Sequence, residues 1–458
     1  MPELQFDNQL IQRYDLAGPR YTSYPTAVQF TDEFSDSDYI NQVALSNQTG
    51  RPLSLYFHIP FCDTICFYCA CNKIVTRNRK RAQPYLDSLY KEIALQADLF
   101  DKSRKVDQLH WGGGTPTFIS HDQMRQLMQQ TRTHFNLHDD DQGEYSIEID
   151  PREANTETIK LLRELGFNRI SLGVQDVDPA VQKAVNRIQT VEQTAEVIHA
   201  ARDQHFHSLS IDLIYGLPHQ TEERFSRTLQ TVLDFNPDRL SVFNYAHLPE
   251  MFKTQKQIDT NAIPNAKTKL AILENTINTL TQAGYVYIGM DHFAKPDDEL
   301  AKAQTKGTLY RNFQGYSTHA NCDLVGLGVT SIGMVNDCYS QNYRGMDDYT
   351  QSLANNSLPV YRGIILNEDD KLRRRVITDL ICNFKLNKQI IEQEYSIHFD
   401  HYFIDAMQQL LAMQNDGLVE LTSETISVTA KGSLFIRNIC MCFDNYLQQS
   451  NTRFSKVL

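Results

Sequence analysis

Three cysteines in one short stretch are the residues best suited to chemistry in this chain. Cys62, Cys66 and Cys69 follow an apolar run in a C-x3-C-x2-C spacing. Thiolates this close together on one loop suit a soft metal or an iron–sulfur cluster. Three cysteines leave one iron of a [4Fe–4S] cube without a protein ligand, and an open iron can bind a small molecule.

Two alternatives stay open for these sulfurs. Cys71 follows two residues later and offers a fourth sulfur. A structural zinc site is the other alternative, although zinc usually takes two separated pairs of ligands and no second C-x2-C lies downstream. The other five cysteines are most simply structural, and Cys440 and Cys442 lie in an apolar segment where cysteine behaves as a small hydrophobe.

A glycine-rich turn is the second chemical signal. The run HWGGGTP covers residues 110–116 and follows a predicted strand. Consecutive glycines let a ligand approach the backbone closely. The run is neither a P-loop, because no Lys-Ser/Thr follows, nor a dinucleotide fingerprint. A tight strand–helix turn is the simpler alternative, but the nearby cysteine loop favours a ligand site.

Six strand–helix units must position these groups. Strands are predicted over 53–59, 106–111, 144–149, 169–175, 208–214 and 239–246, and helices over 81–100, 121–135, 155–165, 190–204, 221–235 and 266–283. This alternation indicates a parallel sheet with right-handed crossovers. Because six units are too few for a complete eight-stranded barrel, we predict an α/β fold with a partial (β/α)6 barrel.

The strands have one apolar and one polar face. In SLSIDLI (208–214), Ser208, Ser210 and Asp212 oppose the apolar residues between them. A parallel strand buried on both faces would be almost entirely apolar, so the pattern predicts a hollow barrel that holds a polar ligand. Several polar or small residues fall at C-terminal strand ends, where ligands bind in α/β folds: Glu148, Gln175, Asp212 and Ala246.

The flanking segments differ from the barrel. Residues 1–50 are polar and irregular, and we predict an N-terminal extension that covers substrate. The barrel and its extension occupy 51–366, with a looser pattern over 294–345. Residues 367–458 predict a small, mainly helical, winged-helix-like domain, with helices over 369–384, 388–395, 400–416 and 430–448 and a hairpin between the last two.

Composition excludes several classes of protein. The 458 residues are 41% hydrophobic and 22% charged, which is ordinary globular composition and not that of a disordered or coiled-coil chain. No apolar run reaches the length of a membrane span, and the net charge of −12 disfavours nucleic-acid binding. The odd number of cysteines, nine, and the absence of an apolar leader predict a reducing, cytoplasmic location with no membrane partner.

The motifs together resemble a known family. The cysteine spacing after the first strand and the glycine turn after the second are the signature of radical S-adenosylmethionine (SAM) enzymes. The chain is most similar to oxygen-independent coproporphyrinogen III oxidases, and the resemblance runs over essentially its whole length. It is carried by YTSYPTA, LYFHIPFCDTICFYCACNKIVTR, LHWGGGTPT, IEIDPRE, FNRISLGVQD, IDLIYGLPHQT, DRLSVFNYAHLP, GMDHFA, RNFQGYST and IRNICMCFDNYL.

The resemblance implies a cofactor set and a reaction. Cys62, Cys66 and Cys69 would hold three irons of a [4Fe–4S] cluster, and two SAM molecules would bind. One SAM, bound to the open iron, would be cleaved to methionine and a 5′-deoxyadenosyl radical. The radical would abstract hydrogen from a propionate of coproporphyrinogen III, and loss of CO2 and one electron would leave a vinyl group. Two such reactions give protoporphyrinogen IX, an intermediate of porphyrin and heme biosynthesis.

The resemblance also implies the residues of the site. Tyr56 and Cys71 are carried over as catalytic residues. The first SAM would contact Tyr56, Gly113, Glu148 and Ile332. The second would contact Tyr68, Gly114, Thr115, Gln175, Arg187, Asp212 and Ala246. Tyr68 stands where the family more often has Phe, and Ala70 where it usually has Gly. The implied partners are the substrate and an unidentified reductant, and a monomer is the family expectation.

Two further expectations concern substrate and function. Coproporphyrinogen III carries four propionates, and the candidate cations that would bind them are Arg20, Lys73, Arg77 and Arg311.

The alternative function is that of a related class of proteins, the heme-binding chaperones. Those proteins share the three spaced cysteines but usually lack Cys71, the following NKIVTR and the N-terminal YTSYPTA. This chain has all three features, which favours the oxidase.

Overall fold

The computed structural model describes residues 6–447, which divide into two compact units. Unit 2 comprises Phe30–Ile272 and Asn321–Ile365. Unit 1 comprises the described residues up to Gln29, Leu273–Ala320 and those from Leu366 onward. Unit 1 therefore gathers segments that are far apart in the sequence. Among the described residues, no helix combines the length and the apolar character needed to cross a membrane.

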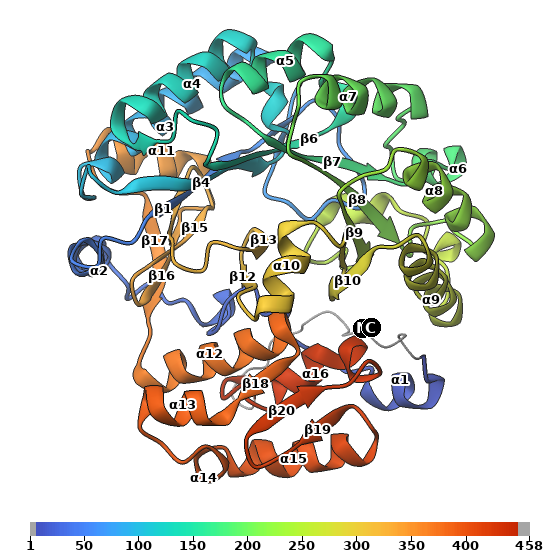
Figure 1. The fold of residues 1–458 in the computed structure, drawn as a ribbon. Coiled ribbons are helices and arrows are strands. Elements are labelled where there is room, and N and C mark those ends of the chain that lie inside the picture. The colour runs from blue at the N-terminus through green and yellow to red at the C-terminus, as the bar shows by residue number, and fades with distance from the viewer. Residues whose placement is uncertain (1–5, 448–458) are drawn as a thin grey trace. The chain divides into compact units, whose positions relative to one another are not determined.

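A curved parallel sheet forms the centre of unit 2. Its strands lie side by side in the order β9 (Arg239–Asn244), β8 (Ser208–Tyr215), β7 (Arg169–Gln175), β6 (Glu144–Ile149), β4 (Lys105–Gly113) and β1 (Leu53–Ile59). The helices that follow the strands cover the outside of the curve in Figure 1: α3 (Ala82–Ala97), α4 (His121–His134), α5 (Thr156–Glu164), α7 (Val191–Asp203) and α8 (Glu222–Asp234). With α9 (Ala266–Gln282), which follows β9 in the sequence, the six predicted strand–helix units and the partial barrel are confirmed.

The alternation of the strands is confirmed in three of them. In β6 and β7, buried apolar residues alternate with partly exposed residues that are polar or glycine, and β8 follows the same pattern from Leu209 to Leu213. In β1, by contrast, every residue except Tyr56 is buried. This strand lies between β4 and a second parallel neighbour, β14 (Asp323–Leu327). Tyr56 is therefore the residue of β1 that remains open to the interior.

The sheet continues beyond β1 in a way the sequence pattern did not predict. After β14, it adds the antiparallel strands β15 (Ile332–Val335), β16 (Cys338–Asn342) and β17 (Val360–Ile365), with α11 (Met346–Ala354) before the last. These strands are short, and β16 is buried throughout although it contains Ser, Gln and Asn. These polar residues obscure the alternation typical of a strand. The sequence pattern therefore predicted no strands over 294–345, only a looser pattern.

The N-terminal extension contains regular structure, so the prediction that residues 1–50 are irregular was wrong. Its elements are α1 (Asn8–Tyr14) in unit 1 and α2 (Asp36–Asn47) in unit 2. In α2, Ser35 and Asp38 form a capping box. The buried face of α2 includes Gln42 and Ser46, and these polar residues break the apolar periodicity on which a helix prediction depends.

Unit 1 combines two short hairpins with the C-terminal helices. The hairpins are β10 (Val286–Gly289) with β11 (His292–Ala294), and β12 (Tyr310–Asn312) with β13 (Gly315–Ser317), and α10 (Glu299–Lys306) lies between them in sequence. The C-terminal part contains α12 (Glu368–Asn383) and α13 (Lys388–Tyr395). Its three-stranded sheet has the order β18 (Lys385–Asn387), β20 (Thr425–Val428), β19 (Val419–Leu421).

Two C-terminal helices differ from the prediction. The helix expected over 400–416 is divided at Phe403 into α14 (Phe399–Tyr402) and α15 (Ile404–Asn415). The Phe403 ring contacts Phe399 and Phe443 with centroids 4.8 and 5.2 Å away, so core packing of this ring accompanies the break. The helix expected over 430–448 is shorter, with a 3-10 turn at Gly432–Phe435 and α16 at Ile436–Met441. Position 448 lies outside the described residues.

Further short elements are β2 (Phe61–Cys62), β3 (Ile74–Val75), β5 (Asn136–Leu137) and α6 (Pro179–Ala184).

A buried ion pair fixes the junction of β1, β4 and β14. Asp323, at the start of β14, accepts hydrogen bonds from Arg104, just before β4, and from Ser46 in α2. The side chains of Arg104 and Asp323 are each 1% exposed. The same carboxylate accepts the amide of Asn336 at 3.0 Å, so four segments meet at one charge.

Replacing Asp323 tests how much its buried carboxylate stabilises the fold. Breaking a buried ion pair leaves an unpaired charge, so Asp323→Ala is expected to lower the free energy of unfolding by about 3–5 kcal/mol. The control is Asp139→Ala, whose carboxylate pairs with Arg132 but is 89% exposed, with an expected loss below about 1 kcal/mol. Denaturant unfolding measures both. Equal losses in the two variants would contradict this account of the junction.

Candidate active site

The cysteine loop starts where β1 ends and is closed at its base. Cys62 lies in β2, which pairs with β3 and so brings residues 61–62 beside 74–75. Inside the loop, the amide of Phe67 donates to the Val185 carbonyl at 3.0 Å. The Asn186 side chain donates to the Ile65 carbonyl at 2.8 Å. The loop is therefore fixed by the backbone after α6 as well as by its own base.

The three sulfurs lie in different electrostatic surroundings. Burial, aided by the charges of Cys69 and Cys66, raises the pKa of the Cys62 thiol to about 12, although a hydrogen bond with Thr115 opposes the rise. A hydrogen bond with Cys71 lowers the pKa of Cys69 to about 6, and Lys73 adds to this shift against the effect of burial. Lys73 Nζ also donates to the carbonyls of Cys69 at 3.0 Å and Cys71 at 3.4 Å.

The spacing of the sulfurs suits a cluster better than a single ion. Three thiolates on one zinc ion, with Zn–S bonds of about 2.3 Å, would lie about 4 Å apart. In the described chain, the sulfurs of Cys62, Cys66 and Cys69 are not all within 4.8 Å of one another. A [4Fe–4S] cluster takes its thiolates on separate irons and so accepts a wider spacing. The residues present therefore fit the predicted cluster.

The glycine turn closes directly on the start of the cysteine loop. The amides of Gly114 and Thr115 donate to the carbonyls of Ile59 and Phe61, each at 2.8 Å. Any residue other than glycine at position 114 would place its Cβ 2.6 Å from the Phe61 carbonyl oxygen, which is too close for a real contact. Gly113 has a φ of +112°, and a Cβ there would lie 2.7 Å from the His58 ring. The glycines thus permit close contact between β4 and the cysteine loop.

A carboxylate and two rings occupy the interior beside this turn. Glu148 accepts the Gly113 amide at 3.2 Å and lies 3.3 Å from His110 Nε2. Tyr56 stacks on His110 with ring centroids 5.8 Å apart, and its hydroxyl lies 3.1 Å from His58 Nδ1. Burial raises the pKa of Glu148, but the hydrogen bonds and charge of His110 and the Gly113 amide outweigh it, so this pKa lies below its ordinary value. Glu148 is thus an ionised carboxylate able to accept an ammonium group.

A second carboxylate nearby has the opposite shift. Burial and the charge of Glu148 raise the pKa of Asp212 to about 6, although hydrogen bonds from Ser241 and Ser171 oppose the rise. The Ser171 hydroxyl lies 3.2 Å from Asp212 Oδ2. The carboxylates of Glu148 on β6 and Asp212 on β8, two strands apart on one polar face, therefore differ in their proton affinity.

The end of β7 carries a strained residue. Gln175 has a φ of +69°, which is uncommon for a residue other than glycine. The β7–β8 register shifts between Gly173 and Gln175. Bulges and strained backbone concentrate beside functional sites, where they redirect a side chain. This geometry supports the prediction of Gln175 as a ligand contact.

The remaining predicted contacts also lie in unit 2. Arg187 is buried and donates to Asp150 at 2.9 Å. Tyr68 packs beside a buried apolar cluster that includes Val181 and Leu217. Ala246 follows β9, and Ile332 begins β15. The predicted cluster ligands and SAM contacts are therefore all residues of unit 2.

One residue of this region, Gln255, was not predicted from the sequence. Gln255 is 1% exposed, and its amide nitrogen donates to the carbonyls of Tyr68 at 3.0 Å and Ala246 at 3.2 Å. It joins two residues predicted to contact the second SAM. Gln255 lies in a polar 3-10 segment, Lys253–Gln257, where nothing in the sequence marks it.

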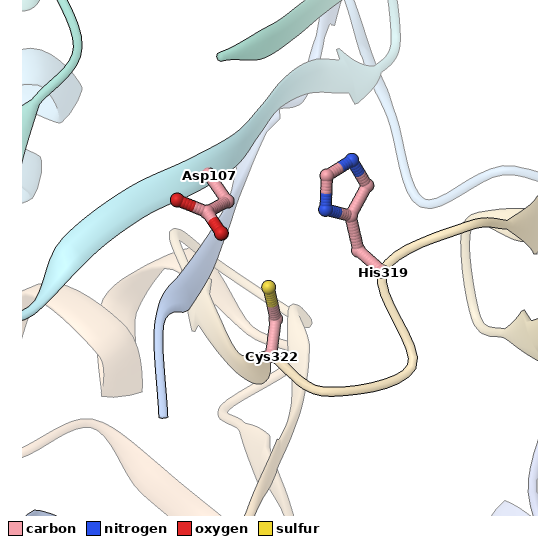
Figure 2. A group of neighbouring side chains, drawn as sticks. All are labelled: Asp107, His319 and Cys322. Carbon is pink, nitrogen blue, oxygen red and sulfur yellow. The ribbon is translucent and has the colours of Figure 1, made fainter. Parts of the chain in front are cut away.

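A second group of residues has side chains of the kinds that bind metals, but we assign no metal site to it. Figure 2 labels Asp107 on β4, Cys322 directly before β14, and His319. His319 belongs to unit 1, whereas the other two belong to unit 2. Within unit 2, Asp107 already lies 2.9 Å from His138 Nε2. Two ligands are fewer than a structural or catalytic zinc ion takes, so we assign no metal here.

The fold and this site define a radical SAM enzyme, with three cysteines on the loop after the first strand of a partial barrel and a polar interior at the strand ends. The radical SAM superfamily model matches residues 56–232, and the HemN C-terminal domain model matches 366–435. The chain belongs to the family of oxygen-independent coproporphyrinogen III oxidases, because it is 54% identical to the one from Pseudomonas aeruginosa over 99% of both chains.

Further relatives agree with this assignment. The Escherichia coli oxygen-independent coproporphyrinogen III oxidase is 50% identical over 100% of this chain and 99% of its own. A solved structure of coproporphyrinogen III oxidase from Escherichia coli, described as a radical SAM enzyme, superposes with a TM-score of 0.93 at 49% identity. The match covers 97% of this chain and 100% of that one. The predicted family, fold class, enzyme class and cofactors, a [4Fe–4S] cluster and SAM, are confirmed.

The raised pKa of Asp212 generates a prediction about stability. The Asp212 carboxyl group binds its proton more tightly in the folded state than in the unfolded state. Protonation of Asp212 therefore stabilises the fold fully below about pH 4, and this stabilisation is lost as the pH rises through about 6. Asp212→Asn removes the cost of the buried charge and is expected to raise the melting temperature at pH 8 by on the order of 2–4 °C, with no difference at pH 4. The same variant is expected to bind SAM more weakly.

Thermal unfolding at both pH values and SAM binding provide the measurements. Asp203→Asn, an exposed carboxylate on α7, serves as the control and is expected to change neither quantity. A variant at Asp212 that is less stable than the wild type at pH 8 would contradict the view that ionisation of this carboxylate costs stability.

Proposed function

We propose that this chain converts two propionates of coproporphyrinogen III to vinyl groups without oxygen, giving protoporphyrinogen IX for porphyrin and heme synthesis. The observation that carries the proposal is the cysteine loop beside a polar barrel interior, in a chain 54% identical over 99% of its length to an oxygen-independent coproporphyrinogen III oxidase. Each propionate loses one hydrogen atom, one CO2 and one electron to an acceptor, and the bond between its two methylene carbons becomes double.

The cofactors and the chain have separate tasks. When bound, the reduced [4Fe–4S] cluster and SAM supply the carbon radical that removes the hydrogen atom. Cys62, Cys66 and Cys69 hold the cluster, and Tyr56, Gly113, Glu148 and Ile332 hold the first SAM. The ionised state of Glu148 supports this, because an ionised carboxylate forms charge-assisted hydrogen bonds with an ammonium group.

A separate set of residues would hold the second SAM. Its proposed contacts are Tyr68, Gly114, Thr115, Gln175, Arg187, Asp212 and Ala246. Asp212 suits ribose hydroxyls, because it accepts hydrogen bonds when ionised and its pKa of about 6 keeps it mostly ionised at neutral pH. The link through Gln255 between Tyr68 and Ala246 supports a common site for these residues.

Arg311 is the strongest of the four candidate substrate cations. Its side chain lies in unit 1, is 7% exposed and stands over the Tyr316 ring at 4.7 Å. Among the described residues, its Nε and Nη1 have no hydrogen-bond partner. Two buried guanidinium nitrogens without an acceptor are costly, so a carboxylate ligand is expected there. The other candidates fit less well, because Arg20 pairs with Asp291, Lys73 binds the cysteine loop and Arg77 is exposed.

The setting of the enzyme is also proposed. None of the nine cysteines forms a disulfide, which agrees with a reducing compartment, and we place the chain in the cytoplasm as a monomer served by a cluster reductant. Nucleic acid and membranes are not proposed as partners. The division into an extension at 1–50 that covers substrate, a catalytic part at 51–366 and a C-terminal domain at 367–458 remains our proposal.

An anaerobic assay tests the function directly. The cluster-loaded chain, coproporphyrinogen III, SAM and a chemical reductant are expected to yield methionine and protoporphyrinogen IX. Cys62→Ala is the matched control and is expected to yield neither. Stable heme binding by an iron-loaded wild-type chain that forms no protoporphyrinogen IX would contradict the proposal in favour of the chaperone alternative.

Replacing Arg311 tests the substrate contact. A hydrogen bond between charged groups contributes about 1.5–3 kcal/mol, so Arg311→Gln is expected to raise the KM for coproporphyrinogen III by roughly 10–100-fold. SAM binding is expected to stay unchanged, because its proposed contacts lie in unit 2. Arg77→Gln, an exposed arginine, serves as the control with an unchanged KM. A KM of wild-type size in Arg311→Gln would contradict this role.

A further inference from the structure

Two guanidinium groups reach the sulfur of one cysteine. Cys66 is 8% exposed, and its Sγ lies 3.6 Å from Arg152 Nη2 and 3.6 Å from Arg187 Nη1. Arg152 belongs to a 3-10 turn, Pro151–Glu153, directly after β6, whereas Arg187 follows α6. Arg187 is already a proposed SAM contact, but Arg152 has no role so far.

A single carboxylate holds both arginines in place. Arg152 donates from Nε to Asp150 Oδ1 at 3.0 Å and from Nη2 to Oδ2 at 2.7 Å. Arg187 Nη1 donates to the same Oδ2 at 2.9 Å. Asp150 is itself fixed, because it accepts the Arg152 amide at 3.1 Å and so caps the turn. The side chains of Arg152, Arg187 and Asp150 are only 16%, 7% and 9% exposed, which limits their movement.

The charges of this group do not balance without a further anion. Two guanidinium groups share one carboxylate, which leaves a net charge of about +1 beside Cys66. As a ligand of the proposed cluster, Cys66 would supply the missing negative charge. The other two cysteines have different neighbours, since Cys62 faces the Thr115 hydroxyl at 3.8 Å and Cys69 faces Cys71 and Lys73. Cys66 is thus the sulfur with two arginine donors.

We propose that Arg152 is a positioning residue that, together with Arg187, donates to the Cys66 sulfur and raises the midpoint potential of the bound [4Fe–4S] cluster. This inference rests on the proposed function, which places a cluster at these cysteines. Reduction adds negative charge to the cluster, and a nearby positive charge or donor to a ligand sulfur stabilises the reduced form. Arg152 thereby makes the cluster easier to reduce before the radical reaction begins.

The midpoint potential is the readout that separates this role from a structural one. We measure it by redox titration with electron paramagnetic resonance on the anaerobically reconstituted full chain, without substrate. Arg152→Gln removes the charge and is expected to shift the potential to a more negative value at wild-type iron and sulfide content. Arg152→Lys keeps the charge and is expected to recover part of the shift. The matched control is Arg163→Gln, which loses a comparable bidentate arginine pair to Asp141 and is expected to keep the wild-type potential.

Each contrary outcome has a distinct meaning. A wild-type potential in Arg152→Gln would overturn the inference while leaving the proposed function intact. Loss of iron in both the Gln and the Lys variants would overturn it as well, because it would show that Arg152 serves assembly of the loop. A wild-type chain that incorporates no [4Fe–4S] cluster would instead refute the cluster assignment on which the proposed function depends.

Discussion

The close approach of two backbone segments is the constraint on which the active site depends. The amides of Gly114 and Thr115 donate to the carbonyls of Ile59 and Phe61, so the glycine turn after β4 is bonded to the start of the cysteine loop after β1. A Cβ at Gly114 would collide with the Phe61 carbonyl. Because these bonds fix the loop against the strand ends, the three sulfurs and the polar interior of the barrel are held beside one another.

Local charge divides this interior into parts with different chemistry. Glu148 stays ionised because His110 and the Gly113 amide offset its burial, whereas Asp212 bears the cost of burial and of the charge on Glu148. On the loop, Cys66 faces arginines and Cys62 faces a neutral hydroxyl. The overall charge of −12 has no bearing on these differences, because they arise from neighbours at hydrogen-bond distance.

The sequence predicted the parts of the structure that follow a regular pattern. Strands 53–59, 144–149 and 169–175 coincide with β1, β6 and β7. In β6 and β7 the alternation of residue types reflects one buried and one open face, whereas β1 is buried except at Tyr56. The polar face also marked Glu148 and Asp212 as interior residues. In contrast, α2 and β16 were missed because buried Gln, Ser and Asn interrupt their apolar pattern. The contacts of Gln255 and Arg152 were not predictable either, since each joins segments that only the tertiary fold brings together.

The central claim is that a radical formed at the cysteine loop removes hydrogen from a substrate propionate. The most direct measurement uses coproporphyrinogen III with deuterium on the propionate carbons next to the ring, in an anaerobic reaction with SAM and a reductant. Mass spectrometry of the 5′-deoxyadenosine product then reports the origin of its added hydrogen. We predict that deuterium appears in 5′-deoxyadenosine as protoporphyrinogen IX forms. Protoporphyrinogen IX formed with 5′-deoxyadenosine that carries no deuterium would contradict the account.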